Sequence, residues 1–179
     1  MVFVKMISQE LLPDVRQWLQ IHGVDERRVH MHEDARGWSA LHIAVDQSVK
    51  HARTGLVIGL LNLARACGGD LAEFVNRSTP PSARPPLYTP VAFAAQAVGV
   101  ERDDIVRALV GARADPCKPF GAQSTPPLFS AAGASNEPVL RCMLDLRADP
   151  RQVAGDGRTL GDIVPRHRGC QNLVLRPNA

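Results

Sequence analysis

The sequence predicts an all-α fold of stacked helix-turn-helix units, and an internal repeat is the first observation behind this prediction. The segment Arg113-Ala-Asp-Pro116 recurs 34 residues later as Arg147-Ala-Asp-Pro150. Apolar residues at helical spacing precede each copy, and a proline follows each expected helix end. The chain is 45% hydrophobic but only 4% aromatic. Small and aliphatic side chains must therefore fill the interior, which suits closely stacked helices.

A second element recurs upstream of the repeated helices. It occurs at four places: Ser39–Ala44, Thr89–Ala95, Pro126–Ala132 and, more weakly, Thr159–Val164. These segments resemble the T-P-L-H-x-A signature of the ankyrin-repeat family, whose repeat is about 33 residues long. The resemblance covers most of residues 34–164 and implies an ankyrin-repeat solenoid, with about three full repeats and partial caps.

The expected units follow one another along the whole chain. They are an N-terminal segment and partial capping repeat (1–33), a first full repeat (34–78), a Pro-rich insertion (79–88), a second repeat (89–118), a third repeat (119–151), and a degenerate C-terminal cap and tail (152–179).

Helical periodicity supports the two units nearest the N-terminus. Over residues 10–21, one face carries Val15, Trp18 and Leu19, with His22-Gly23 at the helix end, although Pro13 is an alternative helix start. A second helix is expected over residues 54–67, ended by Gly68-Gly69. Its buried stripe comprises Leu56, Leu60, Leu61 and Ala64.

The middle units begin with good helix starts. Thr89 can accept hydrogen bonds from free amides, and Pro90 fits the first helical position. Two alanine pairs, Ala94-Ala95 and Ala131-Ala132, leave room for a neighbouring helix to approach closely. Prolines 80, 81, 85, 86 and 90 exclude a helix from the insertion. The C-terminal cap is weak because Pro165 interrupts the expected helix and residues 170–175 are too short for a partner helix.

The spacing of the histidines and cysteines does not predict a metal site or a catalytic site. His42 occupies the His position of the signature, where the resemblance implies structural hydrogen bonds at the helix start. His30 and His32 could share a metal with a third ligand, but a solvated loop is the favoured interpretation. Cysteines 67, 117, 142 and 170 have no close pair, so we expect free thiols in a reducing compartment. The glycines of 155–161 fit an Asp-Gly turn before a helix better than a dinucleotide loop.

Arg113 and Arg147 stand where the ankyrin consensus places a left-handed glycine, and a non-glycine residue there costs roughly 1 kcal/mol. Two interpretations stay open. In the favoured one the arginine side chain reaches the last helix carbonyls, because a cation is favourable at a helix C-terminus. In the other the arginines belong to a binding surface.

Trp38 and Tyr88 immediately precede the Thr-equivalent position, so we expect both rings near exposed hairpin tips, where such residues are enriched in interaction hot spots. The alternative is that each ring covers the edge of the core. The resemblance implies a partner-binding surface on the tips and concave face. Its residues are Arg36, Trp38, Asp46, Gln47, Tyr88, Gln96, Phe120, Gln123, Thr125 and Arg158.

These observations together favour a non-enzymatic protein-protein interaction module, a scaffold or adaptor. A regulatory or targeting fragment of a larger enzyme is the alternative, and a metal-binding or catalytic protein is less favoured. The net charge of +3 is small and its basic residues are scattered, so we expect a protein partner and no nucleic acid. No secretory signal or apolar stretch of about 20 residues is found. We therefore expect a monomer without cofactor, metal or membrane span, in the cytoplasm or nucleus.

Overall fold

The computed structural model describes residues 15–51, 54–68, 70–96, 103–164 and 170, and within these ranges the chain forms helices and no β-strand. A helix occupies residues 15–21. The later elements are η1 (Glu26–Met31), α2 (Ala40–His51), α3 (Thr54–Ala66), α4 (Leu71–Asn76), α5 (Pro90–Ala95), α6 (Asp103–Gly111), α7 (Pro127–Gly133), α8 (Glu137–Asp145) and α9 (Leu160–Ile163). The predicted all-α class is confirmed. Expectations for Pro13, Gly69, Pro165 and residues 171–175 lie outside the described residues.

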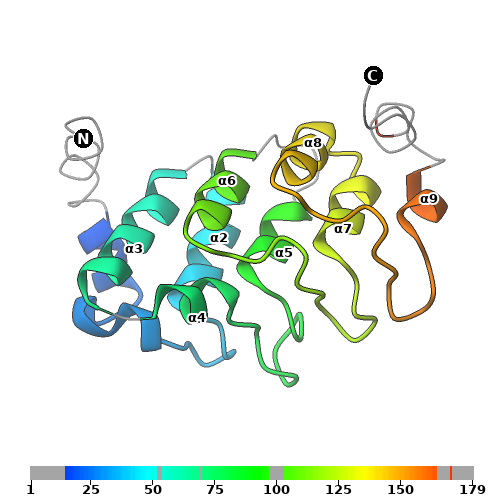
Figure 1. Cartoon of the computed structure of the whole chain (residues 1–179). Coiled ribbons are helices and arrows are strands. Elements are labelled where there is room, and N and C mark those ends of the chain that lie inside the picture. Colours follow the sequence, from blue (N-terminus) through cyan, green and yellow to red (C-terminus); the bar gives the residue numbers. More distant parts are fainter. Residues whose placement is uncertain (1–14, 52–53, 69, 97–102, 165–169, 171–179) are drawn as a thin grey trace.

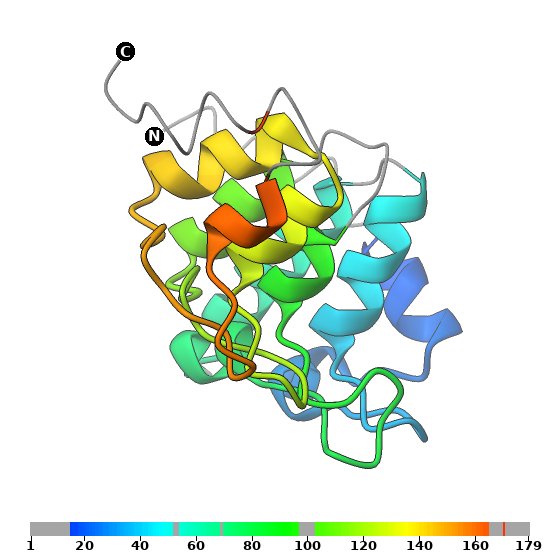
Figure 2. The ribbon, with the colours of Figure 1, turned by 90° about the vertical axis from the view of Figure 1, so that its right-hand side faces the viewer.

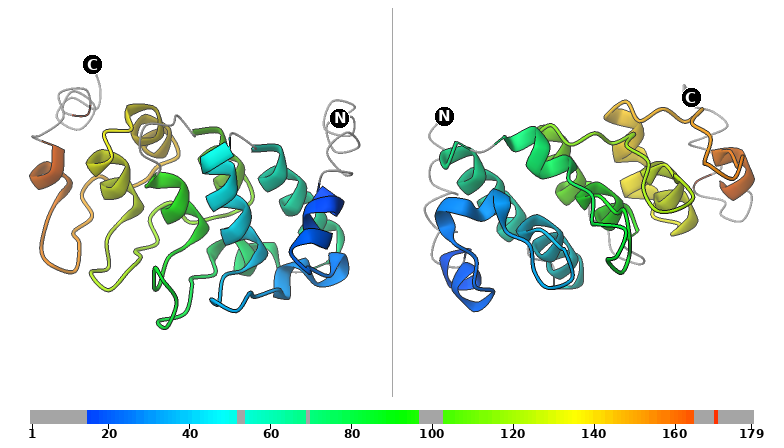
Figure 3. Two further views of the ribbon diagram at one scale, coloured as in Figure 1. Left: turned by 180° about the vertical axis from the view of Figure 1, so that it is seen from behind. Right: turned by 90° about the horizontal axis from the view of Figure 1, so that it is seen from below.

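The helices form two parallel rows (Figure 1). Helices α2, α5, α7 and α9 contact one another in that order in one row, and α3, α6 and α8 do so in the other. Helices α2, α5 and α7 of the first row also pack on the helices that follow them, in the pairs α2–α3, α5–α6 and α7–α8. The view from behind in Figure 3 shows that long loops leave the first row in a common direction.

Local sequence signals explain where the helices begin. The Thr89 hydroxyl accepts from the backbone N–H of Ala92 over 3.2 Å, and Pro90 follows it as the first residue of α5. Asn136 caps α8 in the same way, accepting from the backbone N–H of Val139. The predicted helix start at Thr89 is confirmed.

Helices α6 and α8 end in the same backbone motif. Arg113 has φ 75° and Arg147 has φ 67°, both left-handed. The backbone N–H of Ala114 donates to the carbonyl of Leu109 over 2.9 Å, and that of Arg113 donates to Val110 over 2.9 Å. These two bonds define a Schellman motif, which satisfies the last carbonyls of the helix without any side chain.

The interior consists of small and aliphatic residues, as the composition predicts. The alanine pairs of α5 and α7, Ala94-Ala95 and Ala131-Ala132, are fully buried where the first-row helices meet. The predicted apolar faces are also buried: Val15, Trp18, Leu19, Leu56, Leu60, Leu61 and Ala64. Close stacking of the helices therefore depends on residues without bulk.

Two short helices were not expected from the sequence. Asp70 begins α4 by accepting from the backbone N–H of Glu73 over 3.1 Å, and Asp25 caps η1 by accepting from Arg27. Each follows an acidic residue that can serve as an N-cap, which is the signal that sequence reasoning missed. Helix α4 brings Phe74 and Val75 into the core.

Candidate functional site

The candidate site is the row of loop tips that precede the first-row helices. Isolated antiparallel bridges close three of these loops, pairing Glu33 with Ser39, Phe120 with Thr125, and Val153 with Thr159. Seen along the stack in Figure 2, the loops gather below the helices. The tips therefore present equivalent positions of successive units side by side.

The Pro-rich insertion forms the second loop and extends farther than its neighbours (Figures 1 and 2). The backbone N–H of Thr79 donates to the carbonyl of Tyr88 over 2.8 Å, and that of Leu87 donates back to Thr79 over 3.1 Å. The Thr79 hydroxyl donates to the Pro85 carbonyl and accepts from the Tyr88 N–H. The prediction that residues 79–88 form a non-helical loop is confirmed, and this loop is closed by hydrogen bonds at its base.

Backbone hydrogen bonds link the second tip to the third and the third tip to the fourth. The N–H of Gly121 donates to the carbonyl of Leu87 over 3.0 Å, and the N–H of Gly155 donates to that of Gln123 over 2.7 Å. A Cβ atom at Gly155 would lie 2.7 Å from the Gln123 oxygen, so this approach requires glycine. The second, third and fourth tips are thus held in register by their own backbones.

Four aromatic rings from three units run along the base of the tips. Phe93 of α5 meets Trp38 edge-to-face with centroids 4.8 Å apart, and Tyr88 meets Phe93 at 5.4 Å and Phe120 at 4.5 Å. Phe93 was absent from the predicted site residues. Its place in the recurring segment Thr89–Ala95, three residues after Pro90, is the signal that could have found it.

The expectation that the Trp38 ring is exposed is wrong. Trp38 is only 6% exposed, because its ring covers the core edge as the alternative interpretation held. Phe120, also a predicted contact, is only 4% exposed. Tyr88 is half-buried, and its hydroxyl accepts from the exposed Gln96 side chain over 2.9 Å. Of the three predicted aromatic contacts, Tyr88 alone keeps surface for a partner.

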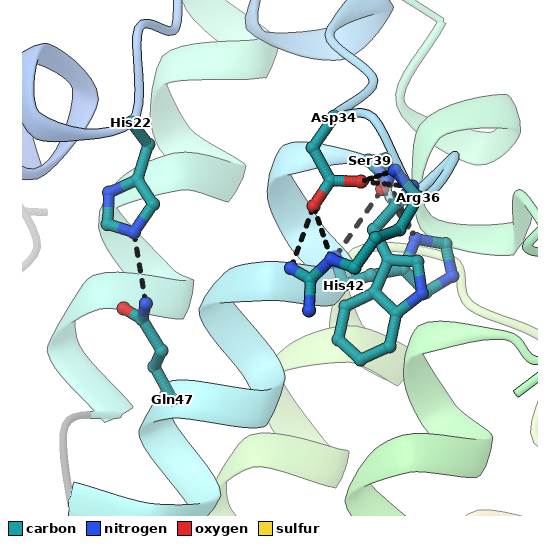
Figure 4. A network of polar contacts seen from close by, with 7 residues as sticks. His22, Asp34, Arg36, Ser39, His42 and Gln47 are labelled. Carbon is teal, nitrogen blue, oxygen red and sulfur yellow. Dashed lines mark hydrogen bonds and ion pairs between the residues drawn. The ribbon is translucent and has the colours of Figure 1, made fainter. Parts of the chain in front are cut away.

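Ion pairs fix the arginines of the first and fourth tips. Arg36 Nη2 lies 2.7 Å from Asp34 Oδ2 (Figure 4). The Arg36 guanidinium stacks over the Trp38 ring, 4.2 Å from the centroid. Partial burial alone would raise the pKa of Asp34, but hydrogen bonds from the Trp38 N–H and from Arg36 lower it overall. Arg158 pairs with Asp156 at 2.6 Å in the equivalent loop.

His42 braces the first unit against the second. Its Nδ1 lies 2.7 Å from the Ser39 hydroxyl, and its Nε2 lies 3.0 Å from the Tyr88 carbonyl (Figure 4 shows the Ser39 contact). Burial lowers the pKa of His42 to about 4, so the ring is neutral at pH 7 and donates through Nε2. The structural role that the sequence predicted for His42 is confirmed.

Gln47 lies apart from the tips and takes part in a different network. Its Oε1 accepts from Trp18 Nε1 over 2.6 Å, and its Nε2 lies 3.0 Å from His22 Nε2 (Figure 4). His22 Nδ1 in turn lies 2.9 Å from the Trp18 carbonyl. Gln47 therefore joins α2 to the helix at residues 15–21 and the turn that follows it, while its neighbour Asp46 is half-buried on α2.

The remaining predicted contacts stay at the surface. Gln123, Gln96, Arg36 and Arg158 are exposed, and Thr125 is half-buried at the bridge with Phe120. We call the exposed and half-buried predicted positions other than Gln47 the tip surface: Arg36, Asp46, Tyr88, Gln96, Gln123, Thr125 and Arg158. It spans four consecutive loops, so a ligand covering it would be an extended molecule.

Groups with the largest pKa shifts lie in the core instead of on this surface. Burial raises the pKa of the Cys142 thiol to about 11, and that sulfur donates to the Asp103 carbonyl. In the described ranges, no cluster of three or more His, Cys, Asp or Glu is placed to hold a metal, and His30 and His32 join no such cluster. In that same part of the chain no helix is long and apolar enough to cross a membrane.

No protein-family model matches the chain, and no curated protein is significantly similar to it. The arrangement of the described residues therefore carries the functional argument.

Proposed function

We propose that this chain is an ankyrin-repeat module, a stack of two-helix units that binds an extended segment of a protein partner on the tip surface and adjoining first-row helices. Its role is that of a non-enzymatic scaffold or adaptor. The observation that carries the proposal is the register of the tips, in which the second loop is bonded to the third and the third to the fourth through main-chain groups. A row held in this way is preorganised, so little order is lost when a partner binds.

The chemistry of the tip surface suits protein recognition. Tyr88 offers an amphipathic ring on a rigid aromatic base, and the Gln96 and Gln123 side chains offer both donors and acceptors for a peptide backbone. Arg36 and Arg158 are neutralised by Asp34 and Asp156 respectively, which makes the surface polar without a strong field of one sign.

Quantitative affinity capture tests this function. A variant carrying Arg36→Ala, Gln96→Ala, Gln123→Ala and Arg158→Ala removes four exposed tip side chains and leaves the buried Trp38 and Phe120 in place. The matched control, Arg107→Ala with Arg141→Ala, changes exposed side chains of the second-row helices α6 and α8.

We expect proteins captured by the wild type and by the control to be depleted at least tenfold with the tip variant. Circular dichroism and thermal unfolding must show that all three proteins are folded. Equal capture by the folded tip variant would exclude the tip surface as the binding site.

A further inference from the structure

The loops that follow α6 and α8 form a second surface, distinct from the tip surface. These segments, residues 112–119 and 146–153, run next to each other on the near side of Figure 1, and we call them the loop ledge. Cys117 joins them, since its Sγ lies 3.4 Å from the Asp149 N–H and its carbonyl accepts from Gln152 Nε2 over 2.9 Å. The ledge is therefore a fixed surface instead of two independent loops.

Arg113 and Arg147 occupy equivalent positions on the ledge, and both are exposed. Their left-handed backbones, at φ 75° and 67°, cost free energy that glycine would avoid. Backbone N–H groups already bond the carbonyls of Leu109 and Val110 in α6, and those of Met143 and Leu144 in α8. Across the described ranges neither guanidinium has a hydrogen bond or ion pair, which removes the capping interpretation of these arginines.

The end of α3 shows that the strain is avoidable. There Gly68 takes the left-handed position with φ 72°, and the cation that favours a helix C-terminus is Arg65, inside the last turn. Two later units instead place arginine at the strained position itself. Strain retained where it brings no intramolecular contact is typical of positions that serve binding.

The two carboxylates of the ledge accept hydrogen bonds from nearby backbone N–H groups and so stabilise local turns. Asp115 Oδ1 accepts from the Cys117 N–H over 2.8 Å, and Asp149 Oδ1 accepts from the Arg151 N–H over 2.9 Å. Among the described residues no ion pair joins either carboxylate to Arg113 or Arg147, and the side chain of Arg151 adds a further exposed cation. With Lys118, the two segments carry four cations and two carboxylates, so the ledge has a net positive charge.

We propose that the ledge binds an acidic, extended segment of a protein partner, with carboxylates on Arg113 and Arg147. Guanidinium groups bind carboxylates through paired hydrogen bonds, and these two arginines can do so without breaking a contact of their own. Packed helices lie about 10 Å apart, and an extended peptide rises about 3.3 Å per residue. Acidic residues three positions apart in the partner match that separation.

Fluorescence anisotropy with defined probes tests the proposal. The probe is a labelled twelve-residue peptide with Glu at every third position and Gly and Ser between, and the comparison probes are the Gln version of this peptide and a single-stranded oligonucleotide of equal charge. The key variant is Arg113→Gly with Arg147→Gly, which removes both cations and relieves the backbone. A control, Arg16→Ala with Arg141→Ala, removes the same charge from other exposed sites.

We expect the Glu peptide to bind the wild type and the control alike, and to bind the glycine variant at least tenfold more weakly. The Gln peptide should bind none of them measurably. Equal weakening in the control, or no weakening in the glycine variant, would overturn the proposal. Preferential binding of the oligonucleotide with the same arginine dependence would overturn it too, by assigning the ledge to a phosphate backbone.

Discussion

His42 and Tyr88 are joined by a hydrogen bond from the imidazole Nε2 to the backbone carbonyl, 3.0 Å long, across 46 positions of the sequence. The bond connects a buried side chain of α2 to the base of the insertion loop. Because Nδ1 accepts from Ser39 at the same time, both ring nitrogens are occupied when the ring is neutral. The contact between the first two units therefore depends on the protonation state of a single side chain.

Lowering the pH should destabilise the fold through His42. Its pKa is about 4 in the folded chain and about 6.5 in an unfolded one, so the unfolded state binds more protons between these values. Stability is then complete above pH 6.5 and is lost as the pH falls toward 4. We expect the free energy of unfolding to drop by about 1 kcal/mol between pH 7 and 5.5, measured by urea unfolding at each pH.

The control for this prediction is His42→Gln, which keeps polar atoms at the site but does not titrate. The variant should be less stable at pH 7, and the loss between pH 7 and 5.5 should shrink by the amount assigned to His42. An identical pH dependence in both proteins would show that other groups cause it.

Asn76 and Cys117 each accept a hydrogen bond from the backbone N–H of an aspartate in the next unit, but the two bonds differ in strength. Asn76 Oδ1 accepts from the Asp115 N–H over 2.7 Å and its Nδ2 donates to the Arg113 carbonyl over 2.9 Å, whereas Cys117 offers one sulfur acceptor to Asp149 at 3.4 Å. Thiols are weak acceptors. We expect Asn76→Ala to lower the free energy of unfolding by about 1–3 kcal/mol and Cys117→Asn to raise it by about 1 kcal/mol.

Chemical unfolding of both variants beside Cys117→Ala checks this prediction. The alanine variant should lose less than Asn76→Ala, because one weak bond is removed instead of two strong ones. If Cys117→Asn were less stable than the wild type, the ledge would lack room for an amide, and the inferred equivalence of the two positions would be wrong.

Glycine at the left-handed positions should stabilise the chain. A left-handed residue other than glycine costs roughly 1–2 kcal/mol, and glycine loses about 0.5–1 kcal/mol more backbone entropy on folding. Arg113→Gly and Arg147→Gly should therefore each raise the free energy of unfolding by roughly 0.5–1 kcal/mol. Thermal and urea unfolding measure this gain.

Alanine separates strain from charge at the same positions. Arg113→Ala removes the guanidinium but keeps the left-handed penalty, so its stability should match that of the wild type within about 0.5 kcal/mol. A gain in the alanine variant equal to that of glycine would mean that charge repulsion, and not backbone strain, is relieved.

Periodic features of the sequence were sufficient to predict most of the fold. The repeat around Arg113 and Arg147, the cap at Thr89 and the alanine pairs all depend on local spacing, and each lies where it was expected. Contacts between units are harder to predict from the sequence. Trp38 precedes its motif just as an exposed tip residue would, yet Phe93 from the next unit and Arg36 above it enclose the ring.

At the candidate site, too, contacts between units could not be predicted from the sequence. Gln47 occupies a surface register on α2, but Trp18 of the helix at residues 15–21 and His22 just after it engage its side chain. Sequence spacing places a residue on one face of its own helix, and only the packing of neighbouring units decides what covers that face. Long-range contacts of this kind could not be predicted from the residues alone.

Enlarging one buried alanine tests how closely the first-row helices pack. Ala131 of α7 is fully buried in the core, where α7 meets both α5 and α9. Ala131→Leu should lower the free energy of unfolding by about 1–3 kcal/mol or more, because extra methyl groups force the helices apart. The matched control is Ala66→Leu at the exposed end of α3, which should change stability by less than about 0.5 kcal/mol. Urea unfolding of both variants gives the comparison, and equal stabilities would show that α7 has room to spare and that small residues do not set the spacing of the stack.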